Sequence, residues 1–241
     1  YSSAASDVYK RQVLDQLKQL AMMTRVLAGH LADPIEPEDV RKAILLLKRS
    51  TALGCDLWEV EFLRLISGDM LQLMADLFNH IEEVGAWPSH IMCNIIVLMG
   101  KAQGGSRPIA LMPMLYRLWA NICKPAIDTW AAEDQSPWAA AVKGSSALRA
   151  AILTLFVDKV HHLTDEEVMS ILWDMVKFYD SINISKLVKK AQDLGYPLRV
   201  AALGLMMHMV PRVIKANMHH EVCDLPANGI IAGCTQSNKF A

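Results

Sequence analysis

One segment carries an aspartate at the end of an apolar run. Residues 171–180 read Ile-Leu-Trp-Asp-Met-Val-Lys-Phe-Tyr-Asp, so Asp174 closes the run and Tyr179 follows five residues later. The apolar and branched residues favour a β-strand that carries Asp174 to its exposed end. A carboxylate there is the hard oxygen ligand that a divalent cation prefers. Many buried strands also end in aspartate, so the segment alone does not establish a metal site.

A second segment places two cations on either side of a flexible turn. The apolar residues 95–99 and Gly100 lead to Lys101, and Gly104-Gly105-Ser106 precedes Arg107. Lysine supplies a point charge and arginine a planar fork, and together they suit the oxygens of a triphosphate. On spacing alone, a surface hairpin with two solvated cations is the simpler interpretation.

Composition indicates a folded globular chain. Of its 241 residues, 53% are hydrophobic and 20% are charged, which argues against disorder over most of the length. The longest interval without Asp, Glu, Lys or Arg, Val84 to Gly100, has 17 residues and contains Pro88, so no membrane span is expected. Five scattered cysteines without a C-x-x-C pair favour a reducing intracellular compartment, nuclear or cytoplasmic.

The net charge of −1 gives no global argument for nucleic-acid binding. The distribution of charge is more informative than the sum. The interval from Met99 to Lys124 contains four basic residues and no acid, and the interval from Lys177 to Lys215 contains seven basic residues against two acids. Positive charge is therefore concentrated around the candidate chemistry, although solvated helix faces would explain any single lysine or arginine.

The elements that must position these residues are mixed helices and strands. Apolar spacing, start signals such as Pro37-Glu38-Asp39 and stop signals such as Gly85 and Gly195 define them. Helices are expected over residues 12–29, from 37 to a break at Gly54, and over 69–84, 109–130, 145–160, 183–194 and 197–209. Strands are expected over residues 91–99, the run ending at Asp174, 212–217 and 220–225. The order predicts an α+β domain, helix-rich with a small antiparallel sheet. Neither G-x-x-x-x-G-K-[ST] nor G-x-G-x-x-G is present.

Taken together, the segments resemble the fingers and palm of a reverse transcriptase of the non-LTR retrotransposon type. The resemblance runs in order from about Val40 to Ala241, and an ordered set of motifs is harder to obtain by chance than any single one. In the first half of the chain, residues 47–56 resemble the family's K-A-x-G-x-D-G pattern, and residues 77–88 resemble its helix and G-x-x-P turn. Lys101 with Arg107-Pro108-Ile109 matches the K…R-P-I block. In the second half, residues 174–181 resemble D-x-x-K-A-F-D-S-V, residues 195–197 resemble G-x-P, and residues 229–234 resemble G-x-x-Q-G.

The resemblance implies an enzyme, an RNA-directed DNA polymerase that uses an RNA template, a DNA primer and dNTPs. It implies two Mg²⁺ ions in an in-line nucleotidyl transfer. Asp174 would ligate the metals with help from the Met175 carbonyl, and Lys101 and Arg107 would hold the triphosphate of the dNTP. Tyr179 would exclude a 2′-hydroxyl, and Gly233 would allow the backbone to approach the template or nucleotide closely. The residues that would support the site are Lys177, Asp180, Gly229 and Ala232.

The chain departs from the family pattern in three ways. Ala232 stands where the family has Gln, and Phe178 stands where it has a small residue. The sequence contains no Y/F-x-D-D segment, so we expect a domain truncated before the rest of the palm and the thumb of the same polyprotein, inactive as given. The alternative is a non-catalytic nucleic-acid-binding remnant of a decayed retroelement.

The expected domain organisation has three parts. Residues 1–12 resemble a non-native linker, 13–36 a helical N-terminal extension and 37–241 the polymerase domain, with fingers over about 37–165 and a partial palm over about 166–241. A zinc site at His219, His220 and Cys223 is disfavoured, because adjacent histidines in a strand point to opposite faces.

Overall fold

The computed structural model describes residues 7–8, 10–15, 17–19, 33–102, 104–133, 146–165, 167, 169, 177–216, 219–223, 225–226, 228–232, 234 and 236–240. The chain forms two compact units. Unit 1 combines Tyr1–Trp130 with Lys177–Ala241, and unit 2 comprises Ala131–Val176. The sheet and the candidate site residues in the described ranges belong to unit 1.

Helices and one small sheet make up the described part of the chain, which confirms the α+β class. The elements are α2 (Pro37–Leu46), α3 (Val60–Leu65), α4 (Gly68–Val84), η1 (Ser89–Ile91), β1 (Asn94–Gly100), β2 (Ser106–Leu111), α5 (Met114–Glu133), α6 (Ala147–Leu163), α7 (Phe178–Ser181), α8 (Ile184–Asp193), α9 (Leu198–His208), β3 (Arg212–Ala216), β4 (His219–Cys223) and α10 (Ser237–Phe240). Residues 10–15 and 17–19 are also helical. None of the helices in the described ranges is long and apolar enough to cross a lipid bilayer.

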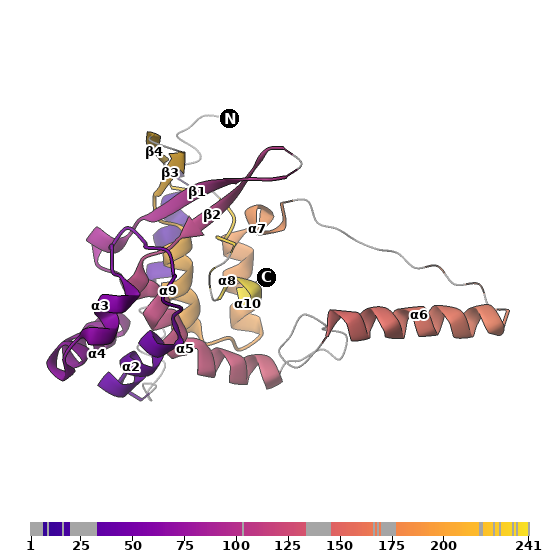
Figure 1. Cartoon of the computed structure of the whole chain (residues 1–241), viewed down its shortest axis with the longest axis horizontal. Helices are drawn as coiled ribbons and strands as arrows, with labels where there is room; N and C mark the ends of the chain where they lie inside the picture. Colours follow the sequence, from indigo (N-terminus) through magenta and orange to yellow (C-terminus); the bar gives the residue numbers. More distant parts are fainter. Residues whose placement is uncertain are drawn as a thin grey trace. The chain divides into compact units, whose positions relative to one another are not determined.

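The sheet has four strands in the order β2-β1-β3-β4 (Figure 1). The β3–β4 hairpin is antiparallel, as expected, and the β1–β2 hairpin is antiparallel too, but β1 and β3 pair in parallel. The expectation of a purely antiparallel sheet was therefore wrong. A long helical connection separates β2 from β3, and such a crossover allows β3 to return beside β1 in the same direction. The run ending at Asp174 lies outside the described residues.

Local start and stop signals set most helix ends. Pro37 opens α2, where Asp39 accepts a hydrogen bond from the Glu36 N–H. Ser67 caps α4, and Gly85 ends it with a left-handed φ of 70°. Asn183 caps α8 by accepting a hydrogen bond from the Lys186 N–H at 3.0 Å. The bounds of α4 and α8 agree with the sequence pattern to within a few residues. By contrast, α2 ends at Leu46, before the expected break at Gly54, because Leu47 takes an extended backbone conformation with ψ 135°.

Two other helices also differ from the sequence pattern. Residues 109–111 belong to β2, and the following helix α5 begins only at Met114. The Asp56 carboxylate accepts a hydrogen bond from the Leu115 N–H at 3.0 Å, so a residue distant in the sequence satisfies the first turn of α5. The short helix α3 was not anticipated, because six residues provide too little periodicity to detect.

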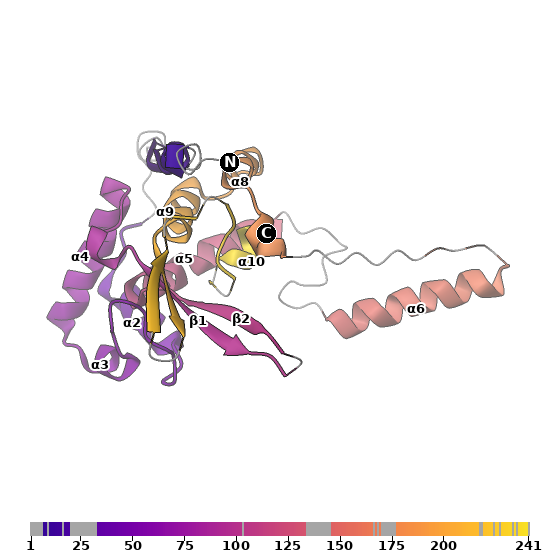
Figure 2. The same cartoon turned by 90° about the horizontal axis from the view of Figure 1, so that it is seen from above.

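An aromatic cluster links the helices that support the sheet. Trp87 lies 5.6 Å from Tyr116 and 5.2 Å from Trp119, measured between ring centroids. The Trp87 indole donates to the Leu203 carbonyl at 2.9 Å, which ties the turn after α4 to α9. On the sheet, the buried Asn94 amide donates to the Met207 carbonyl at 2.7 Å. The first residue of β1 is thus tied to the C-terminal end of α9, and Figure 2 shows α9 next to the ends of the strands.

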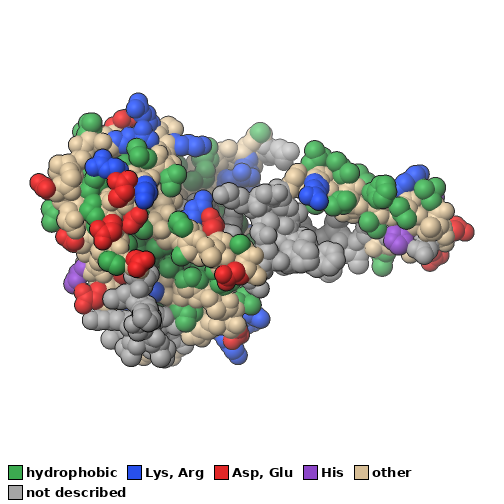
Figure 3. Space-filling view, turned by 90° about the horizontal axis from the view of Figure 1, so that it is seen from below, with side chains coloured by type: hydrophobic (Ala, Val, Ile, Leu, Met, Phe, Trp, Pro, Cys, Tyr) green, Lys and Arg blue, Asp and Glu red, His purple; other side chains and the backbone are tan. Residues whose placement is uncertain are grey.

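Unit 2 contains α6, whose described side chains are mostly exposed. The Ser146 hydroxyl caps the helix by accepting a hydrogen bond from the Arg149 N–H. This start agrees with the helix predicted over residues 145–160. Hydrophobic side chains such as Leu148, Leu155 and Phe156 are exposed, and hydrophobic residues are prominent on the helix in Figure 3. The helix therefore adds no buried side chain to a core within the described residues.

Candidate functional site

The loop that begins at Gly229 pairs with α7 through its backbone. The Gly229 N–H donates to the Ile182 carbonyl at 2.8 Å, and the Ile230 N–H donates to the Tyr179 carbonyl at 2.9 Å. Gly229 has a φ of +87°, and a Cβ at this position would lie 2.9 Å from both the Cα and the carbonyl oxygen of Asp180. Glycine is required here by conformation and by space. Two segments that the sequence singled out separately are thereby brought into contact.

Tyr179 is held half-buried in the short helix α7. Lys177 precedes the helix in a left-handed conformation with φ 51°, which turns the chain into α7. The Tyr179 ring lies 5.3 Å from the Phe178 ring at an interplanar angle of 63°, and the side chain packs against the buried core. The bulk of Phe178 is thus accommodated beside Tyr179.

A buried histidine of α9, His208, holds the same loop through a hydrogen bond. The His208 Nδ1 accepts a hydrogen bond from the Ile231 N–H at 2.7 Å, and the side chain is 0% exposed. Burial, and secondarily the nearby Arg212 guanidinium, lower the pKa of His208 to about 3. The imidazole is therefore a neutral acceptor. Sequence reasoning missed His208, since a lone histidine at the end of an apolar helix carries no motif.

Arg212 connects this region electrostatically to α7. Burial lowers the pKa of the Arg212 guanidinium, whereas the Asp180 carboxylate acts in the opposite direction. The guanidinium also donates to the His208 carbonyl at 3.5 Å. The negative charge of Asp180 thus favours the charged form of Arg212, while the cap of α8 is provided by Asn183.

Lys101 and Arg107 lie together at the tip of the β1–β2 hairpin. The Lys101 N–H donates to the Gly105 carbonyl at 3.0 Å, and Gly104 and Gly105 take φ values of +88° and +82°. Arg107 lies opposite Met99 in the strand register. Both cationic side chains are exposed. The predicted turn between the two cations is confirmed.

Arg107 shares a sheet face with other basic side chains. Register and alternation assign one face to Arg107, Ile109 and Leu111 of β2, Ile95, Val97 and Met99 of β1, Val213 and Lys215 of β3, and His220 and Val222 of β4. We call this the open face, because Asn94 and Ile96 on the opposite face are buried while Ile95 and Val97 are only partly covered. The open face combines apolar side chains with basic ones, and none of the strand residues on it is acidic.

A hollow of about 530 Å³ lies at the end of the open face away from the hairpin tip. Its lining comprises Cys55, Leu57, Cys93, Ile95, Val213, Lys215, His219 and His220. Burial raises the pKa of the Cys55 thiol to about 11, so that thiol is protonated at neutral pH. Among the described residues, no group of three or more His, Cys, Asp or Glu side chains could hold a metal ion.

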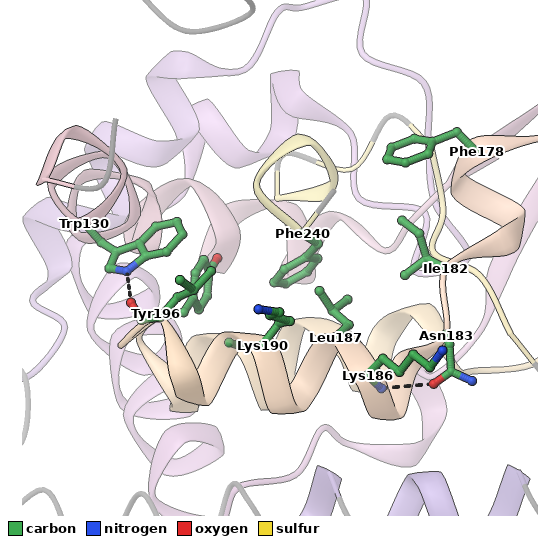
Figure 4. A pocket seen from close by; sticks show the side chains of 11 residues that line it. Trp130, Phe178, Ile182, Asn183, Lys186, Leu187, Lys190, Tyr196 and Phe240 are labelled. Carbon is green, nitrogen blue, oxygen red and sulfur yellow. Dashed lines mark hydrogen bonds between the residues drawn. The ribbon is translucent and has the colours of Figure 1, made fainter. Parts of the chain in front are cut away.

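A second pocket, of about 390 Å³, adjoins α7 and is lined largely by aromatic and aliphatic side chains (Figure 4). We call it the aromatic pocket. Its lining comprises Trp130, Phe178, Ile182, Asn183, Lys186, Leu187, Lys190, Ala191, Leu194, Tyr196 and Phe240. Sequence reasoning did not identify this pocket, because its rings come from four separate segments.

The structure thus brings the predicted site residues together in two groups. Tyr179 and Asp180 adjoin Gly229, with Lys177 at the start of α7 and Ala232 in the turn that follows the loop. Lys101 and Arg107 form the other group, and Figure 2 shows the tip of their hairpin extending away from the C-terminal segment. Asp174, Met175 and Gly233 lie outside the described residues.

The described residues alone do not fit a Mg²⁺ site. Two-metal catalysis needs several convergent oxygen ligands, and the described ranges contain no metal-binding cluster. The carboxylate expected to bind metal, Asp174, is not among them. No protein-family model matches the chain.

Proposed function

We propose that the chain is part of an RNA-directed DNA polymerase of a retroelement, contributing fingers and part of a palm. Its substrates would be an RNA template, a DNA primer and dNTPs. The contact between α7 and the Gly229 loop carries the proposal, because residues 174–181 and 229–234 resemble two polymerase motifs and parts of both lie against each other. Chance resemblance of unrelated segments would not require them to meet.

The open face supports the proposal electrostatically. Arg107 on β2 and Lys215 on β3 lie on either side of β1, so two strand spacings of about 4.8 Å each separate their strands. That separation is too wide for one phosphate group and suits different phosphates of an extended strand. Apolar side chains between the cations offer surface to sugars and bases. A nucleic-acid strand is the polyanion that matches this pattern.

In this proposal each predicted residue keeps a distinct role. Lys101 and Arg107 bind the triphosphate of the incoming dNTP, and Arg107 contacts a template phosphate when no dNTP is bound. Tyr179 restricts the sugar pocket against a 2′-hydroxyl. Asp174 supplies a metal ligand, and bound Mg²⁺ would stabilise the charge that develops at the transferred phosphate. Gly229 allows the loop to approach α7 closely, which fixes the position of the Tyr179 backbone.

Binding of a primed RNA template by the 241-residue chain tests the proposal. We expect Arg107→Gln and Lys215→Gln each to weaken binding about threefold to tenfold and to lower the slope of log K against log salt by about 0.7 to 0.9. Fluorescence anisotropy of a labelled template, measured across a salt series, provides both numbers. Lys42→Gln on α2 is the matched control, because Lys42 is exposed and its nearest carboxylate, Asp39, belongs to the same helix. Equal losses in all three variants, or no binding, would contradict the proposal.

Catalysis requires a separate measurement. We expect the chain as given to bind without extending a primer, because it carries no aromatic-x-Asp-Asp segment. In a chain continued in frame through such a segment, Asp174→Asn should abolish dNTP incorporation and leave template binding nearly unchanged. Binding without incorporation by that continued chain would favour the non-catalytic remnant. Full incorporation by the Asp174→Asn variant would refute the role of this aspartate.

A further inference from the structure

The aromatic pocket is held by rings in defined contacts. The Trp130 and Tyr196 centroids lie 4.8 Å apart at an interplanar angle of 70°, and the Tyr196 and Phe240 centroids lie 5.7 Å apart at 49°. The Trp130 indole donates to the Leu194 carbonyl at 2.9 Å, which fixes the orientation of that ring. The pocket volume of about 390 Å³ is in the range that holds small organic ligands.

Two lysines give the pocket a single sign of charge. Lys186 and Lys190 are four residues apart in α8, so both lie on the side of the helix that lines the pocket. Figure 4 shows Lys190 beside Tyr196 and Phe240, and Lys186 at the end near Ile182. No carboxylate lines the pocket, and neither lysine forms an ion pair with a carboxylate in the described ranges.

The combination of rings and uncompensated cations defines the ligand chemistry. A flat ring stacks favourably against aromatic side chains, and an anionic substituent is attracted to an ammonium group at the rim. A purely apolar ligand would make no contact with either charge, and neither ammonium group has a carboxylate partner among the described residues. We propose that the aromatic pocket binds a small planar aromatic anion, with its ring among Trp130, Tyr196 and Phe240 and its acidic group at Lys186 or Lys190. This site is separate from Lys101 and Arg107 and does not depend on polymerase activity.

A pair of fluorescent probes tests the proposal on the whole chain. The anionic probe is 8-anilinonaphthalene-1-sulfonate, and the uncharged comparison is N-phenyl-1-naphthylamine. Replacing both Lys186 and Lys190 by Gln should weaken binding of the sulfonate about tenfold and change binding of the uncharged probe less than about twofold. Lys189→Gln is the matched control, because Lys189 is exposed on the same helix and does not line the pocket.

A pocket-filling variant separates this site from other apolar surface. The exposed hydrophobic side chains of α6 also attract such probes, so total fluorescence alone is not decisive. Leu194→Trp places a bulky ring at the pocket wall and should remove the lysine-dependent part of the sulfonate binding. Near-ultraviolet circular dichroism checks that each variant remains folded. Sulfonate binding that is insensitive to the double lysine variant, or that falls equally with Lys189→Gln, would overturn the proposal.

Discussion

At the scale of single residues, His208 illustrates how burial selects one chemical form of a side chain. The imidazole is fully buried and accepts the Ile231 N–H, and an accepting Nδ1 cannot carry a proton. Protonation would remove that hydrogen bond and place a charge beside Arg212 in a region without solvent. The residue therefore acts as a structural acceptor that holds the loop next to α7.

The stability of the chain should depend on His208 between pH 6.5 and pH 3. Its pKa is lowered from 6.5 to about 3 in the folded state, so within this window the unfolded chain binds more protons. The stabilising contribution is present above pH 6.5 and is lost as the pH falls towards 3, by at most about 5 kcal/mol. Urea denaturation at several pH values should show a smaller pH dependence for His208→Gln than for the wild type.

Matched histidines make this pH measurement specific. His90 is exposed, so His90→Gln should leave the pH dependence of the free energy of unfolding unchanged. Carboxylates contribute to acid denaturation in every variant, and the comparison cancels their share. Identical pH profiles for the wild type and His208→Gln would show that His208 does not carry the effect.

At the scale of elements, the approach of the Gly229 loop to α7 should be sensitive to a single methyl group. Gly229→Ala combines a positive φ with contacts of 2.9 Å to Asp180, whereas Gly195→Ala has a φ of +64° but no atom within 4 Å of the added Cβ. We expect the free energy of unfolding to fall by about 1 kcal/mol for Gly195→Ala, from backbone strain alone, and by at least about 2 kcal/mol for Gly229→Ala. Chemical denaturation measures both, and equal losses would contradict the close approach.

Elements set by local signals could be predicted from the sequence, whereas those set by distant contacts could not. The ends of α4 follow from Ser67 and Gly85, which act within one helical turn. The parallel pairing of β1 with β3 has no local signal, since it depends on a connection of about a hundred residues. The start of α5 was misplaced for the same reason, because its first turn is satisfied by Asp56.

In the candidate site, too, features set by local signals could be predicted and those set by distant contacts could not. The turn between Lys101 and Arg107 could be predicted because its glycines are adjacent in sequence. The anchoring of the loop by His208, and the four-segment aromatic pocket, are products of tertiary packing and have no short motif. The metal-binding role of Asp174 stays a prediction that rests on the sequence.

At the scale of the whole molecule, apolar side chains are used differently in the two units. In unit 1, Phe78 is 0% exposed and belongs to the continuous core. In unit 2, Phe156 on α6 is 66% exposed. Burial rather than residue type decides how much each ring contributes to stability, because the hydrophobic contribution scales with the apolar area removed from water.

The same substitution in both units tests this difference. Phe78→Ala should lower the free energy of unfolding of unit 1 by about 3 to 5 kcal/mol, because it removes a buried ring and leaves a cavity. Phe156→Ala should change it by less than about 0.5 kcal/mol, since an exposed ring loses little burial and alanine favours the helix. Trp138 and Trp173 belong to unit 2, so both are replaced by Phe in the background used for this test. Urea denaturation followed by the remaining tryptophan fluorescence then reports on unit 1, which contains Trp87 and Trp119 in its core. A loss of several kcal/mol for Phe156→Ala would mean that its ring is buried in solution, and the exposed surface assigned to α6 would have to be withdrawn.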